Sequence, residues 1–296
     1  MVLSMKSLMK PHSSLASLVL FVNQNKERAR PLVPRLQEWC ASHEVICTLI
    51  EHESKKGNDP VQIQKYRQTI LDSQADLICV LGGDGTLLRA ADAFAQLSIP
   101  LLPIQTGSVG FLMSLPMEHV IAALDELVMQ ARFPLDERIM LKAHTDRDED
   151  PLYCTNEFVV TFEDTTRLHA VKVTVDHQYL ATYRTDSLII STATGSTGHN
   201  LSAHGPIIHP AMDAVAVTPV CAYALNLRPL VVPASQVIEI STEGTSEPLI
   251  LVSDGQSRRT TTRTVSIARS KHPLLLVKTS RSLSFFDTLH QKFNWQ

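Results

Sequence analysis

The chain has 296 residues, more than a single hydrophobic core usually serves, so we expect two domains. Its 27 basic and 30 acidic residues leave a net charge of −3, which gives no general electrostatic reason to bind nucleic acid or an anionic membrane. The five cysteines are scattered, without a Cys-x-x-Cys pair that would suggest zinc or redox chemistry. This usage predicts reduced thiols in a cytoplasmic protein.

The N-terminal region allows two interpretations. Lys6 and Lys10 precede the apolar run 15–22 and could imitate a signal peptide. The run lacks a clear small-residue cleavage site, however, and passes into Asn23-Gln24-Asn25. A first β-strand that enters a polar loop explains this pattern better. No other apolar stretch approaches the ~18 residues that span a bilayer, so we expect no membrane partner.

The first part of the chain alternates apolar strands with helical patterns, as a parallel sheet requires. The predicted strands cover residues 17–22, 45–50, 75–81 and 99–104. The predicted helices cover residues 29–42, 61–73, 87–95 and 117–131. We therefore expect an N-terminal Rossmann-like α/β domain with a parallel sheet over residues 1–134.

After about residue 134 the pattern changes to a period of two, as in Val171–Asp176. Further strands are predicted at 158–162, 187–191, 214–220, 236–241, 249–253 and 263–269. This indicates a C-terminal antiparallel β-sandwich-like domain over residues 135–271. Helical spacing of apolar residues in 285–295 predicts a last helix, and we expect segment 272–296 to complete the first domain.

The apolar strand ending at Leu81 leads into Gly82-Gly83-Asp84-Gly85-Thr86 and then a helix. Open α/β sheets bind ligands at this end of their strands, and glycines followed by helix N–H groups suit a phosphate. Phosphates would repel Asp84, so its presence needs a reason. It could hold a magnesium ion, or accept the proton of a hydroxyl that attacks a γ-phosphate. The plain alternative is that Asp84 caps the helix.

Residues 81–91, Leu-Gly-Gly-Asp-Gly-Thr-Leu-Leu-Arg-Ala-Ala, resemble the signature of the NAD kinases. Diacylglycerol kinases and phosphofructokinases share only the shorter Gly-Gly-Asp-Gly-Thr core. Residues 105–112 resemble a second loop of the family, from which Gln105 and Val109 depart. Segment 136–141 resembles the start of the family's second domain. Asn156-Glu157 matches the Asn-Glu pair that holds the dinucleotide in the family.

The longest match covers residues 183–187 and 191–206, where hydroxyls and glycines are dense. Such a segment suits ribose and base polar groups, although a Ser/Thr-rich loop is the plain alternative. The departures are Ala193 for proline, Ser187 for glycine, Gly198-His199 for Ala-Tyr, and His204 for glycine. An imidazole at position 199 can still stack, and histidine titrates near neutral pH. Segments 228–233 and 254–256 also fit, so the resemblance spans the chain.

The resemblance implies an NAD kinase, which transfers the γ-phosphoryl of ATP to the 2′-hydroxyl of the adenosine ribose of NAD to give NADP. Asp84 would be the catalytic residue, with Mg2+ or another divalent metal offsetting phosphate charge. The implied binding residues are Gly83, Gly85, Arg89, Asn156, Glu157, Arg167, Arg184, Asp186, Thr197, Gly198, His199, Ser202 and Gln256. NAD and ATP are the implied partners, in a homo-oligomer, a dimer or tetramer, whose pockets a neighbouring subunit often completes.

No metal site made by the protein alone is expected, because His199, His204 and His209 have neither a cysteine nor a nearby acidic ligand beside them. Two other functions stay open. A lipid kinase of the diacylglycerol type shares the glycine loop, but segment 191–206 and the lack of a basic or amphipathic membrane surface oppose it. A dinucleotide-binding regulatory protein that has lost catalysis is opposed by the intact Asp84.

Overall fold

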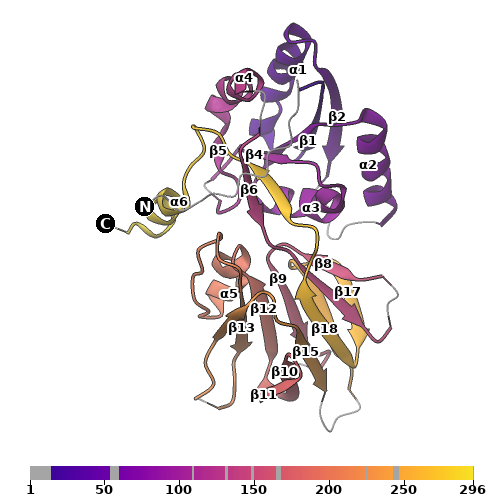
Figure 1. Ribbon diagram of the computed structural model, residues 1–296, viewed down its shortest axis with the longest axis vertical. Helices are drawn as coiled ribbons and strands as arrows, with labels where there is room; N and C mark the ends of the chain where they lie inside the picture. Colours follow the sequence, from indigo (N-terminus) through magenta and orange to yellow (C-terminus); the bar gives the residue numbers. More distant parts are fainter. Residues whose placement is uncertain are drawn as a thin grey trace. The chain divides into compact units, whose positions relative to one another are not determined.

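The computed structural model describes residues 15–53, 60–108, 110–130, 133–147, 150–164, 168–224, 226–242 and 247–295. The described chain forms two compact units (Figure 1). The first unit runs to Glu137 and takes up the chain again from Leu274, and the second runs from Arg138 to Pro273. No helix in the described part combines the length and the apolarity needed to cross a bilayer.

One sheet forms the centre of the first unit, with the order β2-β1-β3-β4-β19-β6 and with β5 beside β4. Its strands are β1 (Ser17–Asn23), β2 (Ile46–His52), β3 (Leu77–Gly82), β4 (Leu101–Gln105), β5 (Leu115–Pro116), β6 (Leu135–Arg138) and β19 (Leu274–Val277). The pairs β1–β2, β1–β3, β3–β4, β4–β5 and β4–β19 are all parallel. β1 and β3 are buried along their whole length, as strands covered on both faces should be.

Helices cover both faces of this sheet. They are α1 (Leu32–Ser42), α2 (Pro60–Ser73), α3 (Asp84–Phe94) and α4 (Val120–Gln130). A last helix, α6 (Phe285–Phe293), places Phe285 and Phe293 near the ring of Phe111 in the loop after β4. Leu20 of β1 belongs to a core with Leu36 of α1 and Leu124 of α4. The next residue along β1, Phe21, points to the other face and contacts Phe94 of α3 edge-on, with ring centroids 5.3 Å apart. The predicted parallel α/β class is confirmed.

Two predicted helices begin later than expected. The pattern predicted a helix from residue 29, but Glu27–Ala29 forms a 3-10 turn and α1 begins at Leu32. Pro34 has no N–H and clashes with a preceding helical turn, so it is tolerated only in the first turn of a helix. In the same way, Met117–His119 is a 3-10 turn before α4.

The second unit consists of two six-stranded sheets, with the orders β11-β10-β15-β18-β7-β8 and β14-β13-β12-β9-β16-β17. Their strands are β7 (Leu141–Thr145), β8 (Leu152–Cys154), β9 (Glu157–Thr161), β10 (His169–Val175), β11 (Gln178–Thr185), β12 (Ser187–Thr192), β13 (Ala214–Val220), β14 (Leu230–Pro233), β15 (Ile238–Thr242), β16 (Leu249–Ser253), β17 (Gln256–Thr262) and β18 (Thr264–Arg269), with the short helix α5 (His199–Ser202) after β12. Neighbouring strands such as β9–β12 and β10–β15 are antiparallel. Val171 and Val173 of one sheet share a core with Leu188 and Ile190 of the other, which confirms the sandwich-like class.

Candidate active site

The glycine loop opens directly onto the N-terminus of α3. Gly83 precedes the helix in an extended conformation, and Asp84 is the first helical residue. No side chain caps the helix, so the structure does not support the reading of Asp84 as a cap. A side chain at Gly83 or Gly85 would meet no described atom within 4 Å. The backbone of the loop therefore has open space beside it, which a ligand could approach.

The carboxylate of Asp84 is bound by a second loop, which follows β4. Its Oδ2 accepts a hydrogen bond from the backbone N–H of Phe111 at 2.9 Å, and its Oδ1 accepts from Leu112 and Met113 at 3.1 and 3.3 Å. A Cβ on Gly110 would lie 2.0 Å from Oδ1, so only glycine permits this approach. Three donors from consecutive residues hold the carboxylate in one orientation.

Polar residues also end β1 and β2, the next two strands along the sheet from β3. Asn23 ends β1 and donates from Nδ2 to Oγ1 of Thr86 at 3.2 Å. His52 ends β2 and is only 3% exposed. Burial, and then the charge of Arg89, lower its pKa to about 4. Neither Asn23 nor His52 was among the predicted site residues, although each is a polar residue at the end of an apolar strand.

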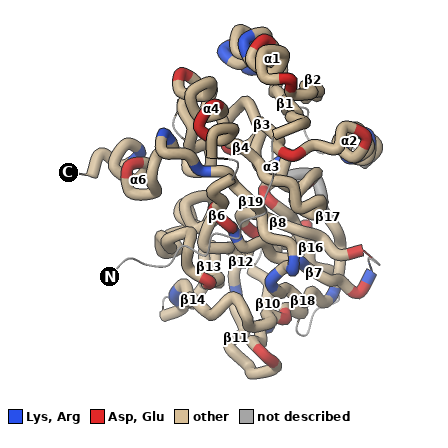
Figure 2. The backbone as a smooth tube through the Cα atoms, turned by 45° about the horizontal axis from the view of Figure 1, so that its top comes forward, with Lys and Arg blue, Asp and Glu red and all other residues tan. Residues whose placement is uncertain are grey.

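Local groups must supply the attraction for phosphate at the glycine loop. Lys and Arg are interspersed with Asp and Glu along both units (Figure 2). The half-buried Arg89 lies in α3, one turn beyond the loop, and the N-terminus of α3 offers backbone N–H groups. These groups provide a cation and donors within the first turns of a single helix.

A second arrangement of the same kind lies in the β unit. Asp254, in the turn between β16 and β17, accepts from the backbone N–H of Thr155 at 2.8 Å through Oδ2. Its Oδ1 accepts from Asn156 and Glu157 at 2.7 and 3.1 Å. Its own N–H donates to the carbonyl of Glu157 at 3.0 Å. The turn therefore fixes the backbone of the Asn-Glu pair at the start of β9.

The turn after β12 packs closely on this pair. A Cβ on Gly195 would lie 2.2 Å from the backbone oxygen of Asn156, and a Cβ on Gly198 would lie 3.5 Å from Oε2 of Glu157. Oδ1 of Asn156 and Oε2 of Glu157 are buried and have no hydrogen-bond partner in the described structure. Burial, and then the charge of Asp254, raise the pKa of Glu157 to about 8. The chain thus brings together Asn156, Glu157 and Gly198 of the predicted site.

Arg184 and Asp186 lie elsewhere in the same unit. They precede β12, whereas Gly195 and Gly198 follow it. Six residues of strand separate the two ends by about 20 Å. Arg184 places its guanidinium 5.9 Å from the ring centroid of Tyr223, and Asp186 is exposed. Within one chain, therefore, Arg184 and Asp186 are not brought to the Asn156–Glu157 pair.

The remaining predicted residues are less informative. Thr197 donates to the carbonyl of Thr194 at 3.4 Å, and His199 and Ser202 are exposed at the ends of α5. Gln256 begins β17, and the structure describes its backbone only. Arg167 lies outside the described residues.

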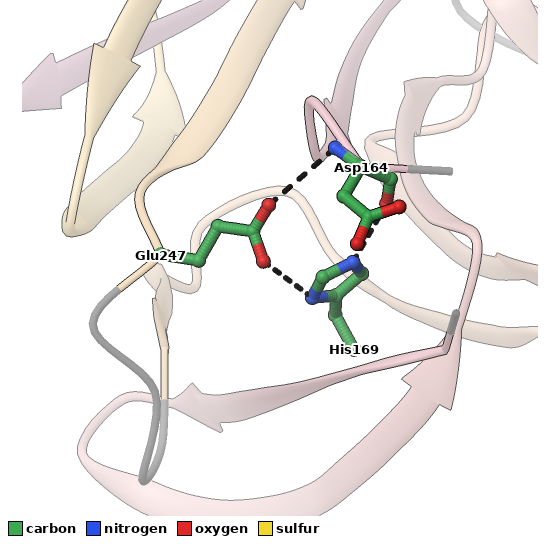
Figure 3. A group of neighbouring side chains, drawn as sticks. All are labelled: Asp164, His169 and Glu247. Carbon is green, nitrogen blue, oxygen red and sulfur yellow. Dashed lines mark hydrogen bonds and ion pairs between the residues drawn. The ribbon is translucent and has the colours of Figure 1, made fainter. Parts of the chain in front are cut away.

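One group of side chains in the described structure has the composition of a metal site, and it contains none of the predicted residues. Asp164, His169 and Glu247 place their potential ligand atoms within 4.8 Å of one another (Figure 3). Nε2 of His169 contacts the backbone oxygen of Asp164 at 2.7 Å, and Nδ1 contacts the carboxylate of Glu247 at 3.2 Å. Both ring nitrogens of His169 thus have partners within the protein, so the arrangement does not require a metal ion.

Comparison with known proteins matches the two parts of the chain to the two domains of one family. Residues 18–132 match the ATP-NAD kinase N-terminal domain, and residues 155–279 match the ATP-NAD kinase C-terminal domain. An NAD kinase of Geobacter sp. (strain M21) is 33% identical over 287 residues, which cover 95% of this chain and 99% of that protein. An NAD kinase of Solibacter usitatus is 34% identical, with 92% of this chain and 94% of that protein covered.

Two solved structures share the fold. An NAD kinase from Archaeoglobus fulgidus in complex with ATP has a TM-score of 0.74 and 23% identity, with 93% of this chain and 99% of that chain covered. A yeast NADH kinase complexed with NADH has a TM-score of 0.76 and 20% identity, with 98% and 91% covered. With both domain matches and relatives above 30% identity over nearly the full length, the chain belongs to the NAD kinase family.

Proposed function

We propose that this protein is an NAD kinase that transfers the γ-phosphoryl group of ATP to the 2′-hydroxyl of the adenosine ribose of NAD, giving NADP and ADP. The 2′-oxygen attacks the γ-phosphorus, and the bond from that phosphorus to the β–γ bridging oxygen breaks. The hydroxyl proton passes to the carboxylate of Asp84. Membership of the family supports the reaction, and the geometry around Asp84 supports the role of that residue.

The observation that carries this proposal is the orientation of Asp84. Phosphoryl transfer has a loose transition state with little covalent chemistry for the protein to perform, so catalysis depends chiefly on positioning. The N–H groups of Phe111, Leu112 and Met113 fix the carboxylate beside a loop that is open at Gly83 and Gly85. Asp84 can therefore orient the attacking hydroxyl and accept its proton without rearrangement of its own.

We assign the phosphates to the N-terminus of α3 and to Arg89. The described residues do not surround Asp84 with further metal ligands, since the one candidate group of three lies at Asp164, His169 and Glu247. Mg2+ commonly keeps its waters and binds through substrate phosphates with one or two carboxylates, and Asp84 suits such a role. When bound, Mg2+ or another divalent ion would offset the charge of the transferring phosphate.

The β unit, with Asn156, Glu157 and the turn at Gly198, would hold the dinucleotide. Arg184 and Asp186 lie about 20 Å away along β12, so we assign them to the pocket of a neighbouring subunit in a homo-oligomer. The five cysteines are free thiols, which suits a reducing compartment such as the cytoplasm.

The test is NADP formation from NAD and ATP-Mg by the purified wild type, by Asp84→Asn and by a control, Asp72→Asn, measured with an NADP-specific dehydrogenase. Asp72 is an exposed residue of α2 in the same unit. We expect turnover by the wild type and the control, and loss of at least ~100-fold in kcat for Asp84→Asn. Equal activity of all three proteins would remove Asp84 from the mechanism.

The same assay separates the two other functions. A wild type that binds NAD without forming NADP would indicate a dinucleotide-binding regulatory protein. A wild type that neither binds nor phosphorylates NAD would redirect the search to lipid acceptors.

A further inference from the structure

Glu157 is a buried carboxyl group that is close enough to the carboxylate of Asp254 to be affected by its charge. Glu157 is 4% exposed, and its Oε2 has no hydrogen-bond partner in the described structure. Oδ1 of the neighbouring Asn156 is likewise buried without a partner. An unsatisfied buried polar atom costs ~1–3 kcal/mol, so two of them side by side indicate that a ligand supplies the missing partners.

Three backbone N–H groups beside Glu157 go to Asp254. Its carboxylate takes three backbone N–H groups, at 2.7 to 3.1 Å, from Thr155, Asn156 and Glu157. Asp254 itself has φ +48°, and Gly255 after it has φ +61°. A left-handed conformation is unfavourable for a residue with a side chain, and it aims the carboxylate back at the start of β9. The donors stabilise the negative charge on Asp254, and none reaches Oε2 of Glu157.

Two neighbouring carboxyl groups with such unequal surroundings separate into one acid and one anion. Burial and the nearby charge of Asp254 raise the pKa of Glu157 to about 8. The other titratable group here is the thiol of Cys154 in β8, whose pKa burial and the two carboxylates raise well above its usual range. Arg138 directs Nη1 to Oγ1 of Thr194, at 3.4 Å.

We propose that Asp254 is a positioning residue that presents Glu157 to the substrate as a neutral carboxylic acid, whose O–H donates to an acceptor atom of the dinucleotide. The inference rests on the proposed function for the identity of the ligand. Beside this donor, Oδ1 of Asn156 accepts. The pair thus offers one donor and one acceptor, which matches a ligand group that carries both, such as a ribose hydroxyl, a carboxamide or the edge of a purine.

The backbone of Gly198 lies beside the pair. Gly198 has no side chain, and a Cβ there would lie 3.5 Å from both Nδ2 of Asn156 and Oε2 of Glu157. A ligand that approaches over this glycine could reach both side chains. An ionised Glu157 would repel the pyrophosphate of the ligand and would lose the O–H, so binding should weaken as Glu157 loses its proton.

The test compares wild type, Asp254→Asn and Glu157→Gln in the full-length protein. Infrared difference spectra over pH 6 to 9 would follow the protonated carboxyl band, assigned by its loss in Glu157→Gln. We expect this band in the wild type at neutral pH, with a midpoint near 8. In Asp254→Asn the midpoint should move to lower pH, because the neighbouring negative charge is gone. This readout does not depend on turnover.

Steady-state kinetics supply the second readout. KM for NAD in the wild type should rise about tenfold per pH unit above the midpoint, while kcat changes less. The rise should begin at lower pH in Asp254→Asn and disappear in Glu157→Gln, whose amide donates at every pH. A purely structural role of Asp254 would lower the unfolding midpoint and leave the KM profile in place, which would overturn the proposal.

Failure of this inference and failure of the proposed function would give different results. If Glu157 is ionised at neutral pH, or titrates at the same pH with and without Asp254, the inference is wrong whatever the activity. If Asp254→Asn does not fold, the wild type and Glu157→Gln still decide whether Glu157 carries the proton. If NAD is neither bound nor phosphorylated, the proposed function fails, although the infrared titration of Glu157 still holds.

Discussion

The two units share one feature. In each, the carboxylate of an aspartate accepts hydrogen bonds from the backbone N–H groups of three consecutive residues that lie far away in the sequence. Asp84 binds Phe111–Met113, which lie 27 to 29 residues away, and Asp254 binds Thr155–Glu157, 97 to 99 residues away. Each contact ties a turn to a second loop. A single carboxylate can therefore fix the backbone of a second segment at three consecutive residues.

The two arrangements differ in which polar groups a ligand could contact. Asp84 is half-buried and lies beside open backbone at Gly83 and Gly85, so the carboxylate itself can meet a substrate. Asp254 is fully engaged with the backbone, and the unsatisfied groups are on its neighbours, Asn156 and Glu157. We therefore propose that the same kind of contact serves a catalytic carboxylate in one unit and a positioning carboxylate in the other.

The largest effect is expected from Gly110→Ala, which would break the arrangement in the α/β unit. The new Cβ would lie 2.0 Å from Oδ1 of Asp84, so the carboxylate or its loop must move. A displacement of about 1 Å at a reacting group can lower kcat ~100-fold. The matched control is Gly107→Ala in the same loop, where a Cβ meets no described atom within 4 Å. Equal kcat for the two variants would show that this contact does not position Asp84.

A smaller effect is expected from Gly195→Ala, which would break the arrangement in the β unit. Its Cβ would lie 2.2 Å from the backbone oxygen of Asn156, and backbone cannot move aside as a flexible side chain can. We expect a loss of about 1–3 kcal/mol in the free energy of unfolding, and a rise in KM for NAD larger than the fall in kcat. Urea unfolding and steady-state kinetics would measure both.

Gly198→Ala provides a graded comparison for Gly195→Ala. Its Cβ would meet the backbone oxygen of Gly195 at 3.2 Å, a much milder contact. The loss of stability should therefore be smaller than for Gly195→Ala. If the two variants are destabilised equally, the close packing on Asn156 is not what requires glycine at position 195.

Much of the fold could be predicted from the sequence. The predicted strands 214–220 and 249–253 coincide with β13 and β16, because both are apolar runs bounded by polar turns. β11 and β17 were missed, since edge strands with polar faces show little apolar periodicity. β19 was missed as well. Its four residues become a strand only by pairing with β4, some 170 residues earlier in the chain.

The candidate site was less accessible to prediction. The position of Asp84 at the end of a buried strand follows from local pattern, and so does the helix after it. The three hydrogen bonds that orient Asp84 could not be predicted, because their donors are backbone N–H groups of another loop. For the same reason no role was predicted for Asp254, which was noted only as part of a segment that resembles the family. The group at His169 and Glu247, 78 positions apart, has no signal in the sequence at all.

The pH dependence of stability, with a slope of about 1.4 kcal/mol per pH unit, tests the comparison through the two buried groups. Glu157 has its pKa raised from 4.5 to about 8, so in this window the folded state holds a proton that the unfolded state has lost. Its contribution to stability is complete below pH 4.5 and is lost as the pH rises. His52 in the α/β unit has its pKa lowered from 6.5 to about 4, so its contribution is complete above pH 6.5 and is lost as the pH falls.

Two variants distinguish the opposite effects of Glu157 and His52 on the pH dependence of the free energy of unfolding. Glu157→Gln should flatten the loss of stability between pH 6.5 and 8, where His52 no longer titrates in either state. His52→Phe keeps a ring against Phe21 and should flatten the loss between pH 6.5 and 4. Urea unfolding of the three proteins at half-unit intervals of pH would measure the slopes. Since each variant removes a single titrating group, a slope equal to that of the wild type in the variant's own pH window would show that the buried group has the same proton affinity in the folded and unfolded chains.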